Sequence, residues 1–337
     1  MPENLLLLRL GYLREFALTS LLRRSDVRLA VLDDHASPHL RAADWALPVT
    51  DVHDQAAVLD LCRGFLRRHG AGGVLTFQDS SLLAAARLAA EFDLPGWERE
   101  PLARAIDKHA TRAALARAGL PCPRHAVAGS LQEAAAALTG IGLPAVLKPT
   151  DRSAGRGVVV VTSWEQLESR YETARAGSLA GRVLVEEFMD GPEVSVESAT
   201  ADGRTTVLAV TGKAADASDP CVEMGHVVPC GLAPEQERAA RELARSALRA
   251  IGFRRGVAHT EVKITPRGPQ IVEINARVAG DCIPELVHLA SGVNLYDVAA
   301  DLALGMRVGA PEAGADRFHD AAAIRFLAAR PGRIVRV

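Results

Sequence analysis

The chain has 337 residues and a formal net charge of −2, with 48% apolar and 24% charged residues. This length predicts two or three packed units of a globular protein. The balanced charge, without a polybasic block, argues against nucleic acid as a partner. The apolar run Leu5–Leu8 is too short for a membrane span or a signal sequence. For this reason no membrane partner is expected. Five scattered cysteines without metal-ligand spacing favour a reduced, cytoplasmic compartment.

The sequence uses lysine sparingly. Of 39 basic residues four are lysines, so 39 − 4 = 35 are arginines. Where lysine is this rare, the remaining lysines are candidates for positions that need a compact, flexible ammonium rather than a planar guanidinium. They are Lys108, Lys148, Lys213 and Lys263.

The first hundred residues alternate predicted strands with predicted helices, which is typical of a parallel α/β unit. A dinucleotide site would need a Gly-rich turn after the first strand, and only Gly11 lies there. We therefore expect a Rossmann-like unit that binds no nucleotide. Strands are predicted at 4–10, 28–33 and 73–77, and helices at 12–24, 54–69 and 80–93.

From residue 101 the pattern changes to a unit with many strands and no internal repeat. A polar stretch over 212–229 interrupts it, and helical segments extend to about Leu304. Helices are predicted at 101–118, 130–139, 163–176 and 233–251, and strands at 144–148, 158–161, 182–188, 193–199, 205–211, 256–264 and 270–277.

The last two of these strands predict a hairpin centred on Arg267. This register places Glu261 opposite Glu273, and His259 opposite Asn275. Directly opposed carboxylates lie roughly 4.5–5.5 Å apart and repel each other. A hard cation such as Mg²⁺ would convert this repulsion into a binding site.

The alternative for this hairpin is a solvent-exposed face whose charges keep the protein soluble. Lys263, Asn275 and Arg277 share the face with the two carboxylates, and this combination favours a site. For Arg277, the alternative is that it pairs with Glu273 or Asp281 and braces the hairpin.

A second candidate element is the turn at 151–157. Gly155 and Gly157 allow backbone amides to approach a phosphate closely, and Ser153 adds a hydroxyl donor. The turn is not a Walker loop, and a plain connection between strands is its alternative. The nearby Lys148 favours the phosphate interpretation.

Six segments in this order and spacing resemble the ATP-grasp superfamily over roughly residues 101–308, in particular its carboxylate–amine ligases, with L-amino-acid ligases and biotin-carboxylase-like enzymes among them. They are Ile106-Asp-Lys-His109, Val146-Leu-Lys-Pro149, Ser153-Ala-Gly-Arg-Gly-Val158, Val185-Glu-Glu-Phe-Met-Asp-Gly-Pro-Glu193, His259-Thr-Glu-Val-Lys263 and Glu273-Ile-Asn-Ala-Arg277.

The resemblance implies an α/β (α+β) ATP-grasp fold. Its expected parts are a Rossmann-like pre-ATP-grasp domain at 1–100, an ATP-grasp domain at 101–308 with a lid at about 119–190, and a short C-terminal segment at 309–337. Within that segment, Ala322–Phe326 is expected to be the opening strand of a truncated C-terminal extension.

For ATP, the resemblance implies phosphate, adenine and ribose contacts. The loop of Ser153, Gly155 and Gly157 would close over the phosphates. The other implied residues are Lys108 and Lys148 at the phosphates, the Glu187 carbonyl and the Met189 amide at the adenine with Glu186 alongside, and Glu193 at the ribose.

For the metal and the reaction, the resemblance implies that Glu261, Glu273 and Asn275 hold Mg²⁺, which Mn²⁺ could replace. Arg277, together with Lys148, would stabilise an acyl phosphate. The segment Thr211–Lys213 with Glu223–Pro229 resembles the lining of the substrate site in amino-acid ligases, where Glu223 and His226 could contact an amino or carboxylate group. Its alternative is a polar surface loop.

The expected activity is that of an ADP-forming ligase that joins a small-molecule carboxylate, as its acyl phosphate, to an amine. One alternative is a carboxylase-like enzyme that activates bicarbonate, which would need a partner carrier because no Met-Lys-Met is present. Another is a non-catalytic ATP-binding protein. With a truncated extension, the acceptor site is expected to be more open, to be completed by a second subunit in a homodimer, or to be built for a small nucleophile.

Overall fold

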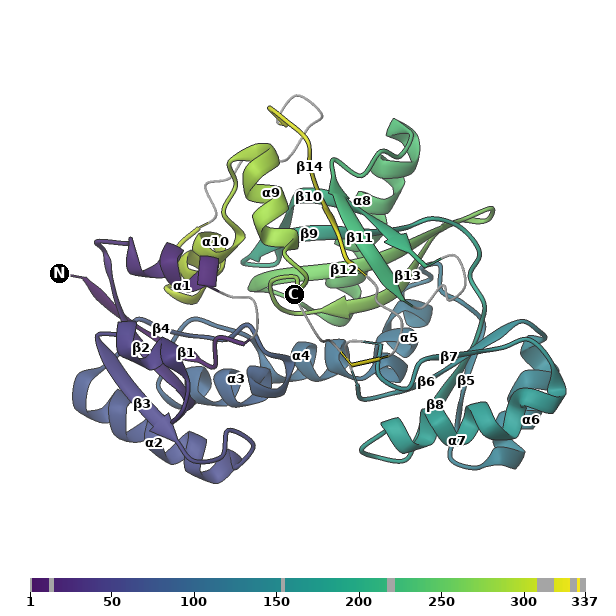
Figure 1. The fold of residues 1–337 in the computed structure, drawn as a ribbon, viewed down its shortest axis with the longest axis horizontal. Coiled ribbons are helices and arrows are strands. Elements are labelled where there is room, and N and C mark those ends of the chain that lie inside the picture. The colour runs from purple at the N-terminus through teal and green to yellow at the C-terminus, as the bar shows by residue number, and fades with distance from the viewer. Residues whose placement is uncertain are drawn as a thin grey trace.

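The computed structural model describes residues 2–11, 15–152, 155–216, 222–307, 318–327 and 332–333. Within these residues the chain forms three β-sheets with helices packed against them (Figure 1). This confirms the mixed α/β class expected from the sequence. No helix in the described ranges combines the length and apolarity needed to cross a membrane.

The N-terminal sheet is parallel, with strand order β3-β2-β1-β4. Leu5 to Leu8 of its inner strand β1 are completely buried, which explains the apolar run near the start of the sequence. Strand β3 was not predicted, because Pro48 lies within it; proline is tolerated there because β3 is an edge strand. The elements are β1 (Glu3–Leu8), α1 (Glu15–Leu22), β2 (Val27–Asp34), β3 (Trp45–Val49), α2 (Gln55–His69), β4 (Gly73–Leu75) and α3 (Leu82–Glu91).

A single helix was predicted at 101–118. This prediction is wrong, because two helices occupy the stretch. They are α4 (Arg99–Ile106) and α5 (Lys108–Arg117). Asp107 between them is extended, and its side chain accepts hydrogen bonds from the amides of His109 and Ala110 at 2.8 and 3.0 Å. This N-cap starts a new helix and places Lys108 in its first turn.

The second sheet is antiparallel, has the order β5-β8-β6-β7, and packs with α6 and α7 around a small core of its own. Figure 1 shows it at the opposite side of the molecule from the N-terminal sheet. The elements are β5 (His125–Ala128), α6 (Leu131–Ile141), β6 (Ala145–Pro149), β7 (Val159–Val161), α7 (Leu167–Gly177) and β8 (Val183–Glu187). The short strand β5 was not predicted.

The largest sheet has the order β13-β12-β9-β10-β11-β14, and its core is continuous with that of the N-terminal unit. The amphipathic helix α8 buries Leu243, Leu248 and Ile251. The elements are β9 (Glu193–Ala201), β10 (Arg204–Ala215), β11 (Glu223–Val228), α8 (Pro234–Ile251), β12 (Gly256–Thr265), β13 (Gly268–Asn275), α9 (Ile283–Ser291), α10 (Leu295–Ala303) and β14 (Ala322–Arg325).

The hairpin of β12 and β13 has the predicted pairs, Glu261 with Glu273 and His259 with Asn275. The turn is shorter than expected, since Thr265 pairs with Gly268. A bulge at Val272 then shifts the register by one residue and restores the predicted pairing.

For the polar stretch at 212–229, the alternative of a surface loop is wrong, because strands form most of its described residues. Its first part, to Ala215, belongs to β10 and its last part forms β11; residues 217–221 lie outside the described ranges. Strand β14 appears where an extension strand was expected, and it pairs antiparallel with β11 at the edge of the large sheet.

Candidate active site

A cleft of about 520 Å³ is lined by residues from α5, from the β5–β8 sheet and from the β12–β13 hairpin. It brings together Glu223 of the predicted substrate site and eleven residues predicted for ATP, the metal and the acyl phosphate, which the sequence spreads over 170 positions, 108 to 277. They are Lys108, Lys148, Gly155, Glu186, Glu187, Met189, Glu193, Glu261, Glu273, Asn275 and Arg277.

Two predicted residues lie elsewhere, and a third is not described. His226 lines a neighbouring cavity of about 210 Å³, which shares Glu193 with the cleft. Gly157 has a left-handed φ of 74°, and a Cβ there would lie 3.0 Å from Pro149. Ser153 lies outside the described residues.

All four lysines of the chain belong to this region. Lys108, Lys148 and Lys213 are almost fully buried, and the side chain of Lys263 is 16% exposed. Buried ammonium groups need partners. Each of these has at least one carboxylate within 3.3 Å.

A buried ion cluster anchors Lys148. Its Nζ lies 2.6 Å from Glu186 Oε2, and Arg112 Nε donates to the other carboxylate oxygen. Burial disfavours the charged form of Glu186, but Arg112 and Lys148 outweigh it and lower its pKa to about 2. Burial also lowers the pKa of Lys148, aided by Arg112, while Glu186 opposes this. Glu186 therefore pairs with two cations, of which Lys148 lines the cleft.

Glu187 at the end of β8 and Met189 just after it form another wall of the cleft. The Glu187 carboxylate accepts hydrogen bonds from Arg124, at 2.9 Å, and from Arg267. Beyond it, the loop packs tightly on β12: Gly191 has a φ of 135°, and a Cβ there would lie 2.0 Å from the Ile264 carbonyl oxygen. Glycine is required at this position because a larger residue would displace the loop.

The two opposed carboxylates of the hairpin each contact a lysine. Glu273 lies 3.0 Å from Lys108 Nζ, and Glu261 lies 3.0 Å from Lys213 Nζ. Lys213 also lies 2.8 Å from both Glu193 and Glu223. Burial disfavours its charge, but these carboxylates raise the pKa of Lys213 well above its ordinary value.

A buried histidine, His259, contacts the carboxylate of Glu261. His259 Nδ1 lies 2.9 Å from Glu197 Oε1, and His259 Nε2 lies 3.3 Å from Glu261 Oε1. Burial opposes protonation, yet Glu197 and Glu261 raise the pKa of His259 to about 10. Glu261 is also ionised: burial opposes this, but Lys213 and His259 lower its pKa well below the usual range. The imidazolium and the ammonium hold its carboxylate in one orientation.

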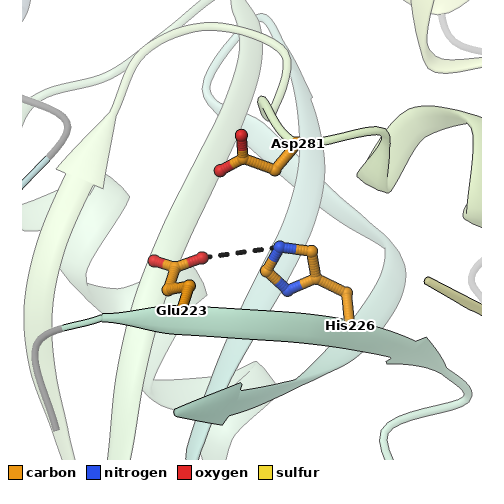
Figure 2. A group of neighbouring side chains, drawn as sticks. All are labelled: Glu223, His226 and Asp281. Carbon is orange, nitrogen blue, oxygen red and sulfur yellow. Dashed lines mark ion pairs between the residues drawn. The ribbon is translucent and has the colours of Figure 1, made fainter. Parts of the chain in front are cut away.

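A third group of side chains gathers beside these carboxylates (Figure 2): Glu223 and His226 rise from β11, and Asp281 faces them from the segment that leads to α9. His226 Nε2 lies 3.4 Å from Glu223 Oε2. Residues three apart on a regular strand would point to opposite faces. The register of β11 on β10 shifts by one residue at Met224, and this bulge brings the two side chains to one face.

The imidazole of His226 is buried, and neither ring nitrogen has a hydrogen-bond partner among the described atoms. Burial lowers the pKa of His226 to about 4, and Lys213 adds to the effect. Burial raises the pKa of Glu223; Lys213 opposes this, whereas Glu261 and Glu193 reinforce it. Glu223 and Asp281 of this group line the cleft, and the neutral imidazole of His226 lines the neighbouring cavity.

Arg277 reaches out of the hairpin to the N-terminal unit. Its Nε and Nη2 donate to the two carboxylate oxygens of Asp79 at 2.6 and 2.8 Å. Burial lowers the pKa of Arg277, but Asp79 outweighs it and raises the value above the ordinary one. The alternative partners expected from the sequence, Glu273 and Asp281, are therefore wrong.

Two site residues were missed in the sequence, although each carried a signal. Arg112 is four residues after Lys108 and so shares its helix face. Asp79 follows strand β4 at its carboxyl end, the edge of a parallel sheet where ligand-binding residues gather. Neither signal indicates the distant partner, which is Glu186 for Arg112 and Arg277 for Asp79.

The fold and this lysine- and carboxylate-lined cleft define the class of protein. The family model of the ATP-grasp domain matches residues 141–285, and that of the ATP-grasp N-terminal domain matches residues 24–96. The chain belongs to the ATP-grasp superfamily of ligases.

Relatives by sequence support this assignment. A D-alanine–D-alanine ligase of Aromatoleum aromaticum is 30% identical over 253 residues, which cover 73% of this chain and 79% of the relative. An uncharacterized protein of Sinorhizobium fredii, y4rH, is 32% identical over 237 residues. That match covers 69% of this chain but only 49% of the relative, so the chain spans about half of that protein's length.

Solved structures show the same fold. An L-amino acid ligase from Bacillus licheniformis superposes with a TM-score of 0.79 at 24% identity, covering 90% of this chain and 74% of that one. The biotin carboxylase domain of a 2-oxoglutarate carboxylase from Hydrogenobacter thermophilus has a TM-score of 0.81 at 19% identity, covering 96% and 74%.

Proposed function

We propose that this protein is an ATP-dependent ligase that activates the carboxylate of an amino acid as an acyl phosphate and transfers the acyl group to an amine. ADP and phosphate are the expected products. The observation that supports this is the convergence of buried lysines, opposed carboxylates and Arg277 on one cleft. Phosphoryl transfer to a carboxylate needs charge neutralisation and positioning more than covalent chemistry from the protein.

The proposed ATP contacts use the walls of the cleft. Lys108 and Lys148 neutralise the phosphates, with Lys148 oriented by Glu186. Gly155 has a φ of 64°, and no described atom lies within 4 Å of a Cβ built there, so the backbone at this glycine borders open space beside the cleft. We assign the adenine to the segment of Glu187 and Met189, and the ribose to Glu193.

The hairpin fits Mg²⁺ by the chemistry of its donors. Glu261, Glu273 and Asn275 offer carboxylate and amide oxygens to the cleft, the hard ligands that Mg²⁺ and Mn²⁺ prefer. When bound, the ion would neutralise phosphate charge during transfer. The contacts of Glu261 with Lys213 and His259 keep its carboxylate ionised and oriented.

We assign the amino-acid substrates to the group of Glu223, His226 and Asp281. The neutral imidazole has no hydrogen-bond partner among the described atoms, so it can accept a hydrogen bond from an amino group. The two carboxyl groups favour the positive charge of that amino group. Among the relatives, the names D-alanine–D-alanine ligase and alanine–anticapsin ligase each describe a protein that joins an amino acid to a second molecule.

The test is a screen of amino-acid pairs with ATP and magnesium, in which ADP, AMP and orthophosphate are quantified. One ADP and one phosphate per dipeptide or amide are expected. Omission of either amino acid is the control and should reduce product formation to background. Stoichiometric AMP with pyrophosphate would exclude an acyl-phosphate mechanism.

A further inference from the structure

The contact between Arg277 and Asp79 joins two sheets that are far apart in the sequence. Asp79 follows β4 of the N-terminal unit, and Arg277 follows β13 of the large sheet. The two N–H···O bonds, at 2.6 and 2.8 Å, form a bidentate pair, the geometry in which a carboxylate orients a guanidinium most strongly. The side chains are 14% and 29% exposed, so solvent screens the pair only partly.

The loop that carries Asp79 is itself anchored. The Gln78 amide donates to Thr76 Oγ1 at 3.1 Å, and the Ser81 amide donates to the Gln78 carbonyl at 3.0 Å. Arg9, at the end of the inner strand β1, donates to Ser80 Oγ at 2.9 Å. These hydrogen bonds hold the turn that carries Asp79 in place.

The pair leaves part of the guanidinium available. Arg277 Nη1 donates to the Val278 carbonyl at 3.1 Å, so three of its five N–H groups have partners within the described part of the chain. One N–H remains on each terminal nitrogen. These two N–H groups are the free edge of the guanidinium, and they are available to phosphate or carboxylate oxygens in the cleft that Arg277 lines.

We propose that Asp79 is a positioning residue of the N-terminal unit, which aims the free edge of the Arg277 guanidinium at the acyl phosphate. This inference rests on the proposed function, in which Arg277 contacts that intermediate. The N-terminal unit then contributes to catalysis without binding nucleotide. Loss of the carboxylate would let the guanidinium move, and a displacement of about 1 Å at a reacting centre can reduce the rate by about 10²-fold.

The chain offers a matched control. Arg24 Nη1 lies 2.6 Å from Asp301 Oδ1 and joins the segment after α1 to α10, with side chains 13% and 34% exposed. This pair also connects the N-terminal unit to the rest of the protein, and neither residue lines the cleft. Arg24 keeps a second carboxylate partner, Asp26. Asp301→Asn should therefore reduce the stability of the protein less than Asp79→Asn does.

The experiment compares Asp79→Asn, Asp79→Glu and Asp301→Asn with the wild-type protein, using the substrates found in the screen. We expect Asp79→Asn to lower kcat about 10²-fold while the KM for ATP stays within twofold. Asp79→Glu should recover at least part of kcat because it keeps a carboxylate, and Asp301→Asn should keep the wild-type kcat. An unchanged kcat in Asp79→Asn, or a change confined to the KM of an amino-acid substrate, would overturn the positioning role.

A second readout separates this inference from the proposed function. The ¹H–¹⁵N signal of Arg277 Nε, identified by its loss in Arg277→Lys, should exchange slowly in the wild-type protein and at least tenfold faster in Asp79→Asn. If the wild-type protein releases no ADP with any pair, the proposed function fails, and this exchange rate alone decides whether Asp79 holds Arg277. Equal exchange rates would overturn the inference even if the ligase activity is found.

Discussion

Replacement of Glu186 by glutamine should destabilise the protein strongly at neutral pH. The carboxylate is buried between Arg112 and Lys148, which are 1% and 6% exposed as side chains. Glutamine has nearly the same shape but no charge, so it leaves two neighbouring cations without a counterion. Breaking a buried ion pair in this way typically costs about 3–5 kcal/mol of unfolding free energy.

The lowered pKa of Glu186 indicates a similar loss of unfolding free energy. A fall from the ordinary value of 4.5 to about 2 corresponds to about 3 kcal/mol, since each tenfold change in proton affinity is worth about 1.4 kcal/mol. Because the folded-state pKa is lowered, this stabilisation is complete above pH 4.5 and is lost as the pH falls toward 2. The difference in stability between wild type and Glu186→Gln should therefore be about 1 kcal/mol smaller at pH 3.5 than at pH 7.

The adjacent Glu187→Gln is the matched control. Its partners Arg124 and Arg267 have side chains 61% and 62% exposed, so water can replace the lost contacts. We expect a loss of at most about 1 kcal/mol there. Urea unfolding of the three proteins at pH 7 and pH 3.5 measures both effects. Equal losses for the two variants, or a Glu186→Gln loss that does not change with pH, would refute the reasoning.

Two further predictions concern the reaction. Arg277→Lys should lower kcat by about 10²–10³-fold and leave ATP affinity nearly unchanged, because lysine cannot form a bidentate contact with the intermediate. Steady-state kinetics and ATP titration measure the two quantities. A variant that melts early but has normal turnover would argue for a purely structural role of Arg277. Glu261→Gln or Glu273→Gln should abolish turnover while the circular dichroism spectrum stays that of the wild type, and turnover near the parental rate at limiting magnesium would contradict the metal assignment.

Much of the candidate site could be predicted from local sequence. The pairing of Glu261 with Glu273 follows from the period of two along each strand and from the position of the turn. The turn was predicted too long and the bulge at Val272 was not foreseen, yet the two deviations cancel. The scarcity of lysine likewise indicated all four lysines: Lys108, Lys148 and Lys263 line the cleft, and Lys213 lines the neighbouring cavity. A polar stretch was predicted where β11 forms, because the bulge at Met224 breaks the alternation and Gly225 and the buried His226 are not typical strand residues.

By itself, the sequence determined the alternation of elements, the hairpin that carries the carboxylates and the residue types of the cleft, because strand period, turn residues and caps act over a few positions. Only the tertiary structure decided which charges meet. Arg112 binds Glu186, 74 residues away, and Arg277 binds Asp79 rather than a neighbour on its own hairpin. The bulge at Met224 likewise brings Glu223 and His226 to one face. Such contacts depend on how whole sheets pack against each other, and a buried charge selects the partner that this packing brings within reach.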